Sequence, residues 1–131
     1  MWGFTYDCHL NSLVIVQKRV IRMINHQPAR SHTNELFISN KILKMKDILE
    51  YRLLIYMFKE KNNFASLISH GYNTRGFMNL RTSLNRTVKS QRSLKYIGPS
   101  HWNKLPIDLK NKGNLNLFKR SLRSYLFTRY S

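Results

Sequence analysis

The chain has 131 residues, of which 42% are hydrophobic and 12% aromatic, so we expect a globular chain with a modest core rather than a disordered one. It carries 23 Lys and Arg against six Asp and Glu, a formal net charge of +17. Such an excess opposes compaction and favours polyanionic partners over a merely basic surface or an anionic membrane surface. The single cysteine, Cys8, excludes an internal disulfide, and the apolar runs are far shorter than the about 20 residues of a membrane span. We therefore expect a protein of the nucleus, the cytoplasm or both, without a membrane partner.

The first predicted helix begins at Asn11-Ser12, which can cap its N-terminus, and runs to about residue 25. Its apolar residues recur at spacings of three and four and therefore share one face, which we expect in the core. They are Leu10, Leu13, Val16, Val20 and Ile24. The opposite face is either simply solvated or contacts phosphates, and it carries Asn11, Lys18, Arg22 and Asn25, with Arg19 at its edge. Gln27-Pro28 should end the helix, because proline disfavours a helical conformation in the residue before it.

The middle of the chain predicts a short helical turn from His32-Thr33 to about residue 37 and then a long helix. Asp47 should cap the long helix, which reaches about residue 61. Its apolar residues cover most of the circumference, as is typical of a helix buried on several sides, so we expect it at the centre of the core. They are Leu49, Leu53, Tyr56 and Met57, extended by Ile48, Ile55 and Phe58.

After Gly71 the pattern favours two short strands, residues 72–80 and 93–97, joined by a polar loop over residues 83–91. Gly98-Pro99 should end the second strand, and a helical turn over residues 100–105 should stop at Pro106. A basic loop over residues 110–113 then leads to a last helix that starts at Asn114 or Asn116. Its apolar stripe is Leu115, Phe118, Leu122, Tyr125 and Leu126, opposite Lys119, Arg120 and Arg123.

These elements predict a single domain over residues 1–131. The expected fold class is mainly α with a small β element, in which a hairpin-like insertion precedes the C-terminal helix. We expect Trp102 to anchor that last helix on the core, because large aromatic side chains dominate core burial. Tyr72 and Tyr96 are interpreted as half-buried strand residues rather than as stacking platforms for bases.

The stretch over residues 72–106 holds seven Lys and Arg and no acid, and residues 64–113 carry a net charge of +8. Clustered cations with interleaved aromatic residues are typical of a nucleic-acid contact. Five of these cations have too few acids nearby in the sequence to be neutralised and are our phosphate candidates: Arg81, Arg86, Lys89, Arg92 and Lys95. Arg75 either joins them or pairs inside the fold, and Lys18 and Arg22 of the first helix complete the predicted set.

The residues that an enzyme would need are missing from the sequence. The six acids form no D-x-D motif or two-metal cluster for phosphoryl transfer, and no Gly-rich nucleotide loop is present. Cys8, His9, His26 and His32 lack the paired spacing of a zinc site. We therefore expect no catalysis by this chain, no metal, no cofactor and no small-molecule substrate.

Short motifs occur in a fixed order along nearly the whole chain. They are the Gln17-Lys18-Arg19 centre of the first helix, residues 32–37 (HTNELF), residues 42–44 (ILK) before Asp47, residues 56–59 (YMFK), residues 70–75 (HGYNTR), Arg86-Thr87, residues 96–99 (YIGP), residues 102–106 (WNKLP) and residues 117–119 (LFK) before Leu122 and Tyr125-Leu126. Together they resemble the C-terminal segment of non-LTR (LINE-type, jockey- or CR1-like) retrotransposon reverse transcriptases. The chain departs from the family in lacking a proline near Ser83, a glycine near Ser90 and a C-terminal zinc knuckle.

The family's catalytic acids lie upstream of this region and are missing here. The resemblance therefore implies a non-catalytic fragment of an RNA-directed DNA polymerase that follows the palm and thumb. Its implied partners are template RNA or target DNA, held through the backbone, and the upstream polymerase domains. The alternative is a basic structural or protein-interaction domain that packs against the polymerase thumb.

Overall fold

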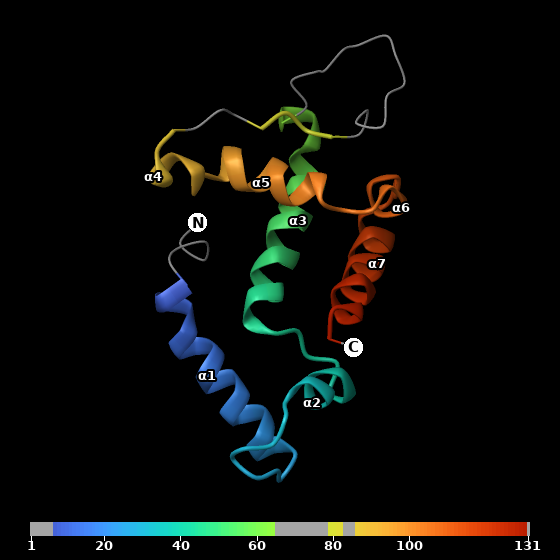
Figure 1. Ribbon diagram of the computed structural model, residues 1–131. Helices are drawn as coiled ribbons and strands as arrows, with labels where there is room; N and C mark the ends of the chain where they lie inside the picture. Colours follow the sequence, from blue (N-terminus) through green and yellow to red (C-terminus); the bar gives the residue numbers. More distant parts are fainter. Residues whose placement is uncertain (1–6, 65–78, 83–85, 131) are drawn as a thin grey trace. The chain divides into compact units, whose positions relative to one another are not determined.

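The computed structural model describes residues 7–64, 79–82 and 86–130, and all regular structure in these ranges is helical (Figure 1). Seven helices occur there: α1 (Asp7–Ile24), α2 (Asn34–Ser39), α3 (Met45–Phe64), α4 (Val88–Gln91), α5 (Leu94–Asn103), α6 (Ile107–Lys110) and α7 (Leu115–Thr128). The mainly α prediction is confirmed. None of the helices in the described ranges is long and apolar enough to cross a membrane.

The predicted β element is not present in the described residues, and the prediction of its second strand is wrong. Only Ser93 is extended, with ψ 150°, as the N-cap of α5; residues 94–97 are helical, and the helix continues through Gly98 and Pro99. Gly98, Pro99 and Trp102 are buried, because helical spacing turns all three to one side. The first predicted strand, residues 72–80, lies outside the described residues except for 79 and 80, which are not in a strand.

The chain forms two compact units. The central unit comprises Arg52–Leu122, and the terminal unit comprises Trp2–Tyr51 together with Arg123–Ser131. The division falls inside α3 and inside α7, so each of these helices contributes residues to both cores.

The core of the central unit is built on three aromatic rings. Phe58 of α3 stacks on Phe118 of α7 with 4.5 Å between ring centroids, and Trp102 of α5 lies 5.9 Å from Phe118 and 6.4 Å from Phe58. Trp102 is buried and therefore anchors α7 in the core, as predicted. Aliphatic side chains fill the rest of this core: Leu53, Leu54, Met57, Leu105, Leu109 and Leu122. Tyr56, predicted on the inner face of α3, is instead exposed.

In the terminal unit, α1 turns a different face inward from the predicted one. Leu10 and Ile21 are buried, whereas Leu13, Val16, Val20 and Ile24 are exposed. The reason is a polar side chain, Gln17, which lies between the two buried residues on the helix. Its Nε2 donates to the Leu43 carbonyl at 2.8 Å and its Oε1 accepts from the Met45 N–H at 2.8 Å. These hydrogen bonds hold the connection between α2 and α3 against this side of α1.

The start of α3 is also held by the end of the chain. The Tyr130 hydroxyl accepts from the Lys44 N–H at 2.8 Å and donates to Asp47 Oδ2 at 2.6 Å, while Lys44 Nζ lies 4.1 Å from the centre of the Tyr130 ring. Arg129 donates to both oxygens of Glu50, at 2.6 and 3.1 Å. Hydrogen bonding to Glu50 raises the pKa of Arg129 above its usual range. Two of the few acids in the chain are therefore used inside the fold.

Candidate nucleic-acid interface

Four of the predicted phosphate candidates are exposed on the central unit: Arg81, Arg86, Lys89 and Lys95. Arg81 lies in the short described segment 79–82, Arg86 precedes α4, and Lys89 and Lys95 belong to α4 and α5. The fifth, Arg92, is the half-buried C-cap of α4. Arg75 lies outside the described residues.

Helix α4 occupies the second half of the predicted polar loop. Thr87 is its N-cap, with an extended backbone and Oγ1 accepting from the Ser90 N–H at 3.3 Å. This is the ordinary capping role of a threonine side chain. Because α4 and α5 are in contact and are separated only by Arg92 and Ser93, three of the cations lie within one short helical corner. The predicted polar loop over residues 83–91 is therefore wrong in its last four residues, 88–91, which are helical.

A hydrogen-bonded clamp fixes the segment that carries Arg81. The Asn103 side chain pairs with both backbone groups of Leu80: Nδ2 donates to the Leu80 carbonyl at 2.8 Å and Oδ1 accepts from the Leu80 N–H at 2.8 Å. This pairing replaces the strand partner that the segment lacks in the described residues. Asn103 is the last residue of α5, so the clamp holds Leu80, the residue before Arg81, against the end of that helix.

Lys110 is the second part of the clamp. Its side chain is 7% exposed, and Nζ donates to Asn79 Oδ1 at 2.9 Å and to the Asn103 carbonyl at 3.0 Å. Neither oxygen carries a formal charge, and burial lowers the pKa of the Lys110 amine. Lys110 therefore has a structural role; it is the last residue of α6, so the predicted basic loop begins one residue later, at 111.

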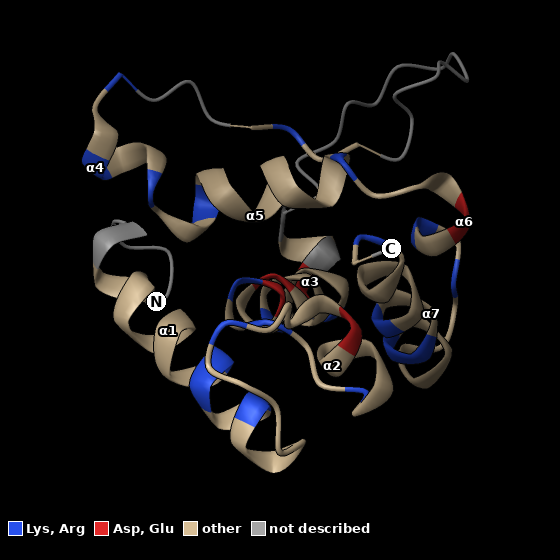
Figure 2. Ribbon diagram, turned by 60° about the horizontal axis from the view of Figure 1, so that its bottom comes forward, with Lys and Arg blue, Asp and Glu red and all other residues tan. Residues whose placement is uncertain are grey.

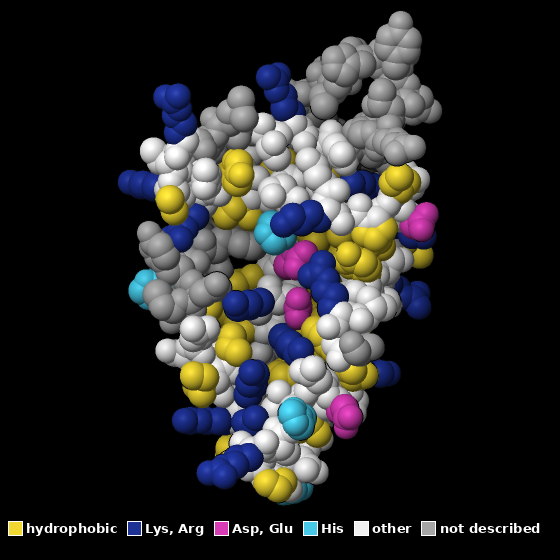
Figure 3. Space-filling view, viewed as in Figure 1, with side chains coloured by type: hydrophobic (Ala, Val, Ile, Leu, Met, Phe, Trp, Pro, Cys, Tyr) yellow, Lys and Arg dark blue, Asp and Glu magenta, His cyan; other side chains and the backbone are white. Residues whose placement is uncertain are grey.

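The central unit carries a large excess of positive charge. It carries fourteen Lys and Arg against two acids, Glu60 and Asp108, a formal charge of +12. No residue of α4 or α5 is Asp or Glu (Figure 2), and Figure 3 shows Lys and Arg side chains projecting over α4. Among the described residues, none of the acids pairs with Arg81, Arg86, Lys89 or Lys95. Within the described residues, no acid therefore neutralises these four charges.

The two remaining candidates belong to the terminal unit. Lys18 is exposed on α1. Arg22 is half-buried, and its Nε donates to the Ser31 carbonyl at 3.0 Å, across the loop that follows the helix. Arg22 therefore has a structural role in this loop, and its contact with a phosphate stays a prediction.

Sequence reasoning missed the two residues that position the segment 79–82. In the sequence, Asn103 follows Trp102 and Lys110 follows Leu109. This position next to a core residue is the only local sign that either side chain has a structural role. Their partners, Leu80 and Asn79, lie 23 and 31 residues away, and no local pattern links them.

Comparison with protein-family models, with curated proteins and with solved structures gave no match. Among the described residues, no three His, Cys, Asp or Glu side chains come together in a way that could hold a metal ion.

Proposed function

We propose that this chain is a non-catalytic nucleic-acid-binding segment of a retrotransposon RNA-directed DNA polymerase. It holds template RNA or target DNA through backbone phosphates. The observation that carries the proposal is the set of exposed cations on the central unit, Arg81, Arg86, Lys89 and Lys95, none of which pairs with a described acid. The order of short motifs along the chain supports the polymerase origin.

The physical basis is counterion release. A cation that neutralises a phosphate frees the counterions condensed there, so the logarithm of the affinity falls linearly with the logarithm of the salt concentration. Contacts by all four side chains predict a slope of about −3.6 on duplex DNA and about −2.8 on a single strand. Such contacts position the ligand but carry no sequence information, so affinity should depend little on base sequence.

The test is a fluorescence-anisotropy titration of a short RNA and a short DNA duplex at several salt concentrations. The test variant is the triple substitution Arg81→Gln, Arg86→Gln, Lys89→Gln. We expect it to reduce the magnitude of the slope by about two to three units, since each lost phosphate contact removes about 0.7 to 0.9.

The matched control removes the same charge from the same unit elsewhere. Lys59, Lys104 and Arg120 are exposed and lie outside the segment 79–95, so their triple replacement by Gln changes the net charge equally. It should reduce the slope much less. Equal slopes for both variants would show that Arg81, Arg86 and Lys89 do not form the contact surface. They would favour the alternative, a basic domain that packs against the polymerase thumb. Templated primer extension by the purified chain would contradict the non-catalytic part.

A further inference from the structure

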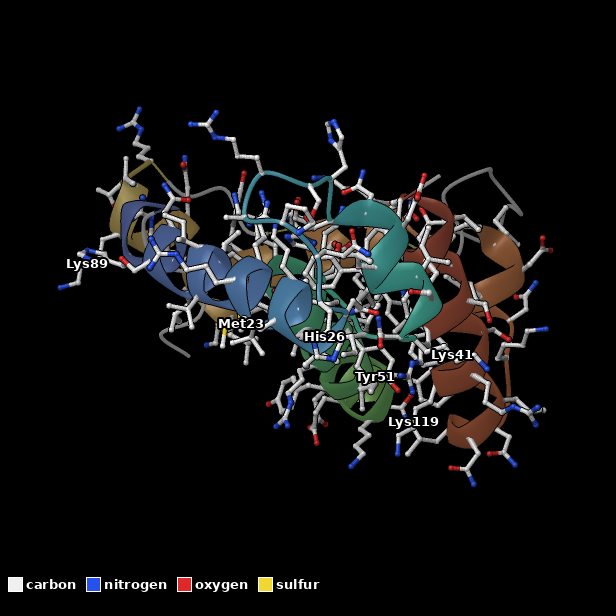
Figure 4. All side chains as sticks on the ribbon, turned by 90° about the horizontal axis from the view of Figure 1, so that it is seen from below. Met23, His26, Lys41, Tyr51, Lys89 and Lys119 are labelled. Carbon is white, nitrogen blue, oxygen red and sulfur yellow. The ribbon has the colours of Figure 1, made fainter. Side chains whose placement is uncertain are left out.

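Helix α1 presents a row of apolar side chains to solvent. Leu13, Val16, Val20 and Met23 are 41%, 53%, 46% and 73% exposed, and Ile24 beside them is 56% exposed. Figure 4 shows the Met23 side chain standing out from the α1 ribbon. The other side of the helix is already occupied, since Leu10 and Ile21 are buried in the terminal unit. Contiguous apolar surface of this kind marks an interaction site more often than scattered single residues do.

The spacing of this row suits another helix. Leu13, Val16, Val20 and Met23 follow one another at three, four and three residues, which is the seam of a two-helix coiled coil. Their exposed area forms a narrow ridge along α1, and an amphipathic helix can lay its own apolar face against such a ridge. Met23 adds an unbranched, adaptable side chain at the end of the ridge.

The positive charge of the terminal unit indicates which kind of partner helix would bind to this row. α1 carries Lys18, Arg19 and Arg22 against Asp7, and the terminal unit as a whole has nine Lys and Arg against four acids, a net +5. Two of those acids, Asp47 and Glu50, are bound by Tyr130 and Arg129. Arg19 lies at the edge of the apolar row, whereas Lys18 and Arg22 lie on the opposite face. A second copy of the chain would add another +17. An acidic partner meets complementary charge.

We propose that the α1 ridge, defined as Leu13, Val16, Val20, Met23 and Ile24, is a docking surface for an amphipathic helix of an acidic partner protein. This surface belongs to the terminal unit and shares no residue with the exposed cations at residues 81–95. It is therefore an interaction site in addition to the proposed nucleic-acid contact, and the two sites can be tested independently.

The probe is a synthetic amphipathic peptide of about three heptads, with Leu at the a and d positions and Glu at the e and g positions. Its control is a scrambled peptide of identical composition, which keeps the charge but has no apolar face. Titration of the full chain, followed by anisotropy, should show binding of the patterned peptide at least about tenfold tighter than binding of the scrambled one. Equal affinities would overturn the proposal, because they would mean charge attraction alone.

The variants localise the site. The double substitution Val16→Gln, Val20→Gln should weaken the patterned peptide by about tenfold or more, since it removes two apolar contacts. Ile15→Gln is the matched control: Ile15 is 51% exposed on the same helix but projects to a different side, so its replacement should leave the affinity unchanged. Circular dichroism of each variant establishes that the helices are retained. Equal weakening by Ile15→Gln would overturn the assignment.

Two other occupants are tested with the same proteins. Sedimentation velocity over a range of concentrations would detect a dimer, and a dimer lost in Val16→Gln, Val20→Gln would assign the ridge to a second copy instead. Co-sedimentation with phosphatidylserine vesicles would detect lipid binding, and a loss in the same variant without peptide binding would assign the ridge to a membrane surface. Either outcome contradicts the proposal of an acidic helical partner.

Discussion

Gly98 is a glycine inside a helix, where this residue usually costs stability, and its neighbour explains why it is there. A Cβ added at Gly98 would overlap Sδ of Met57 and would lie 3.1 Å from Met57 Cε. Met57 is fully buried in α3, so its side chain has little room to move away. The missing Cβ is what allows α5 to approach α3 closely enough for Trp102 to reach the aromatic cluster.

We expect Gly98→Ala to destabilise the protein by about 1–3 kcal/mol, because overpacking in a buried position outweighs the gain of about 0.5–1 kcal/mol that alanine brings to a helix. Gly113→Ala is the matched control: nothing lies within 4 Å of its added Cβ, so its stability should change little. Urea unfolding of both variants measures the difference. A stabilised Gly98→Ala would show that Met57 yields without cost.

Single residues also show where sequence reasoning works and where it stops. The burial of Trp102 and the inward face of α7 could be predicted, because bulk and helical spacing decide them. The roles of Gln17, Asn103 and Lys110 could not, because each binds backbone or side-chain oxygens at least seven residues away in the chain. A polar residue that satisfies such groups can take an inner position from an apolar one.

At the scale of elements, the sequence predicts five segments as helical or as a helical turn, but their ends and faces needed tertiary information. α1 has apolar residues around much of its circumference, and the hydrogen bonds of Gln17 decide which of them are buried. Its end is set by His26, with φ 50°, and by the Gln27 N–H donating to the Arg22 carbonyl at 2.9 Å, rather than by Pro28. The strand predicted over residues 93–97 is the first half of α5, because the helix continues through Gly98-Pro99, a pair that usually interrupts one.

Tyr130 ties the residues after α7 to the beginning of α3, and its ionisation makes this link sensitive to alkaline pH. Burial raises the pKa of Tyr130, and the hydrogen bond to Asp47 raises it further. The link therefore contributes its full stability below the ordinary tyrosine pKa of about 10, and this stability is lost as the pH rises above it, since the unfolded chain then loses the proton first.

Tyr130→Phe should cost about 1–3 kcal/mol at neutral pH, because the partly buried Lys44 N–H and Asp47 lose a partner. Above a pH of about 10 the gap between wild type and variant should narrow, because only the wild type loses stability through this residue. Guanidinium unfolding at a series of pH values from neutral to alkaline measures both free energies. Curves that stay parallel through the alkaline range would show that Tyr130 titrates alike in the folded and unfolded chain.

At the scale of the whole molecule, the charge that favours a polyanionic ligand also opposes folding. The net charge is +17, and twelve of these charges belong to the central unit. Few acids are left to offset them, because Asp47 and Glu50 serve the terminal unit. Screening by salt should therefore stabilise the folded chain, in contrast to proteins held by surface ion pairs.

We expect the melting temperature to rise by several degrees as the salt concentration increases from about 0.1 M to about 1 M, because the Debye length falls from about 10 Å to about 3 Å. The triple variant Arg81→Gln, Arg86→Gln, Lys89→Gln should melt higher than wild type at low salt and respond less to added salt. That comparison separates screening from general salting-out, which acts on both proteins alike. A short RNA added at about one hundred times its dissociation constant should stabilise the wild type by about 2.7 kcal/mol through mass action. If the variant melts lower at low salt, these side chains stabilise the fold, and their exposure reflects a structural role instead of a ligand contact.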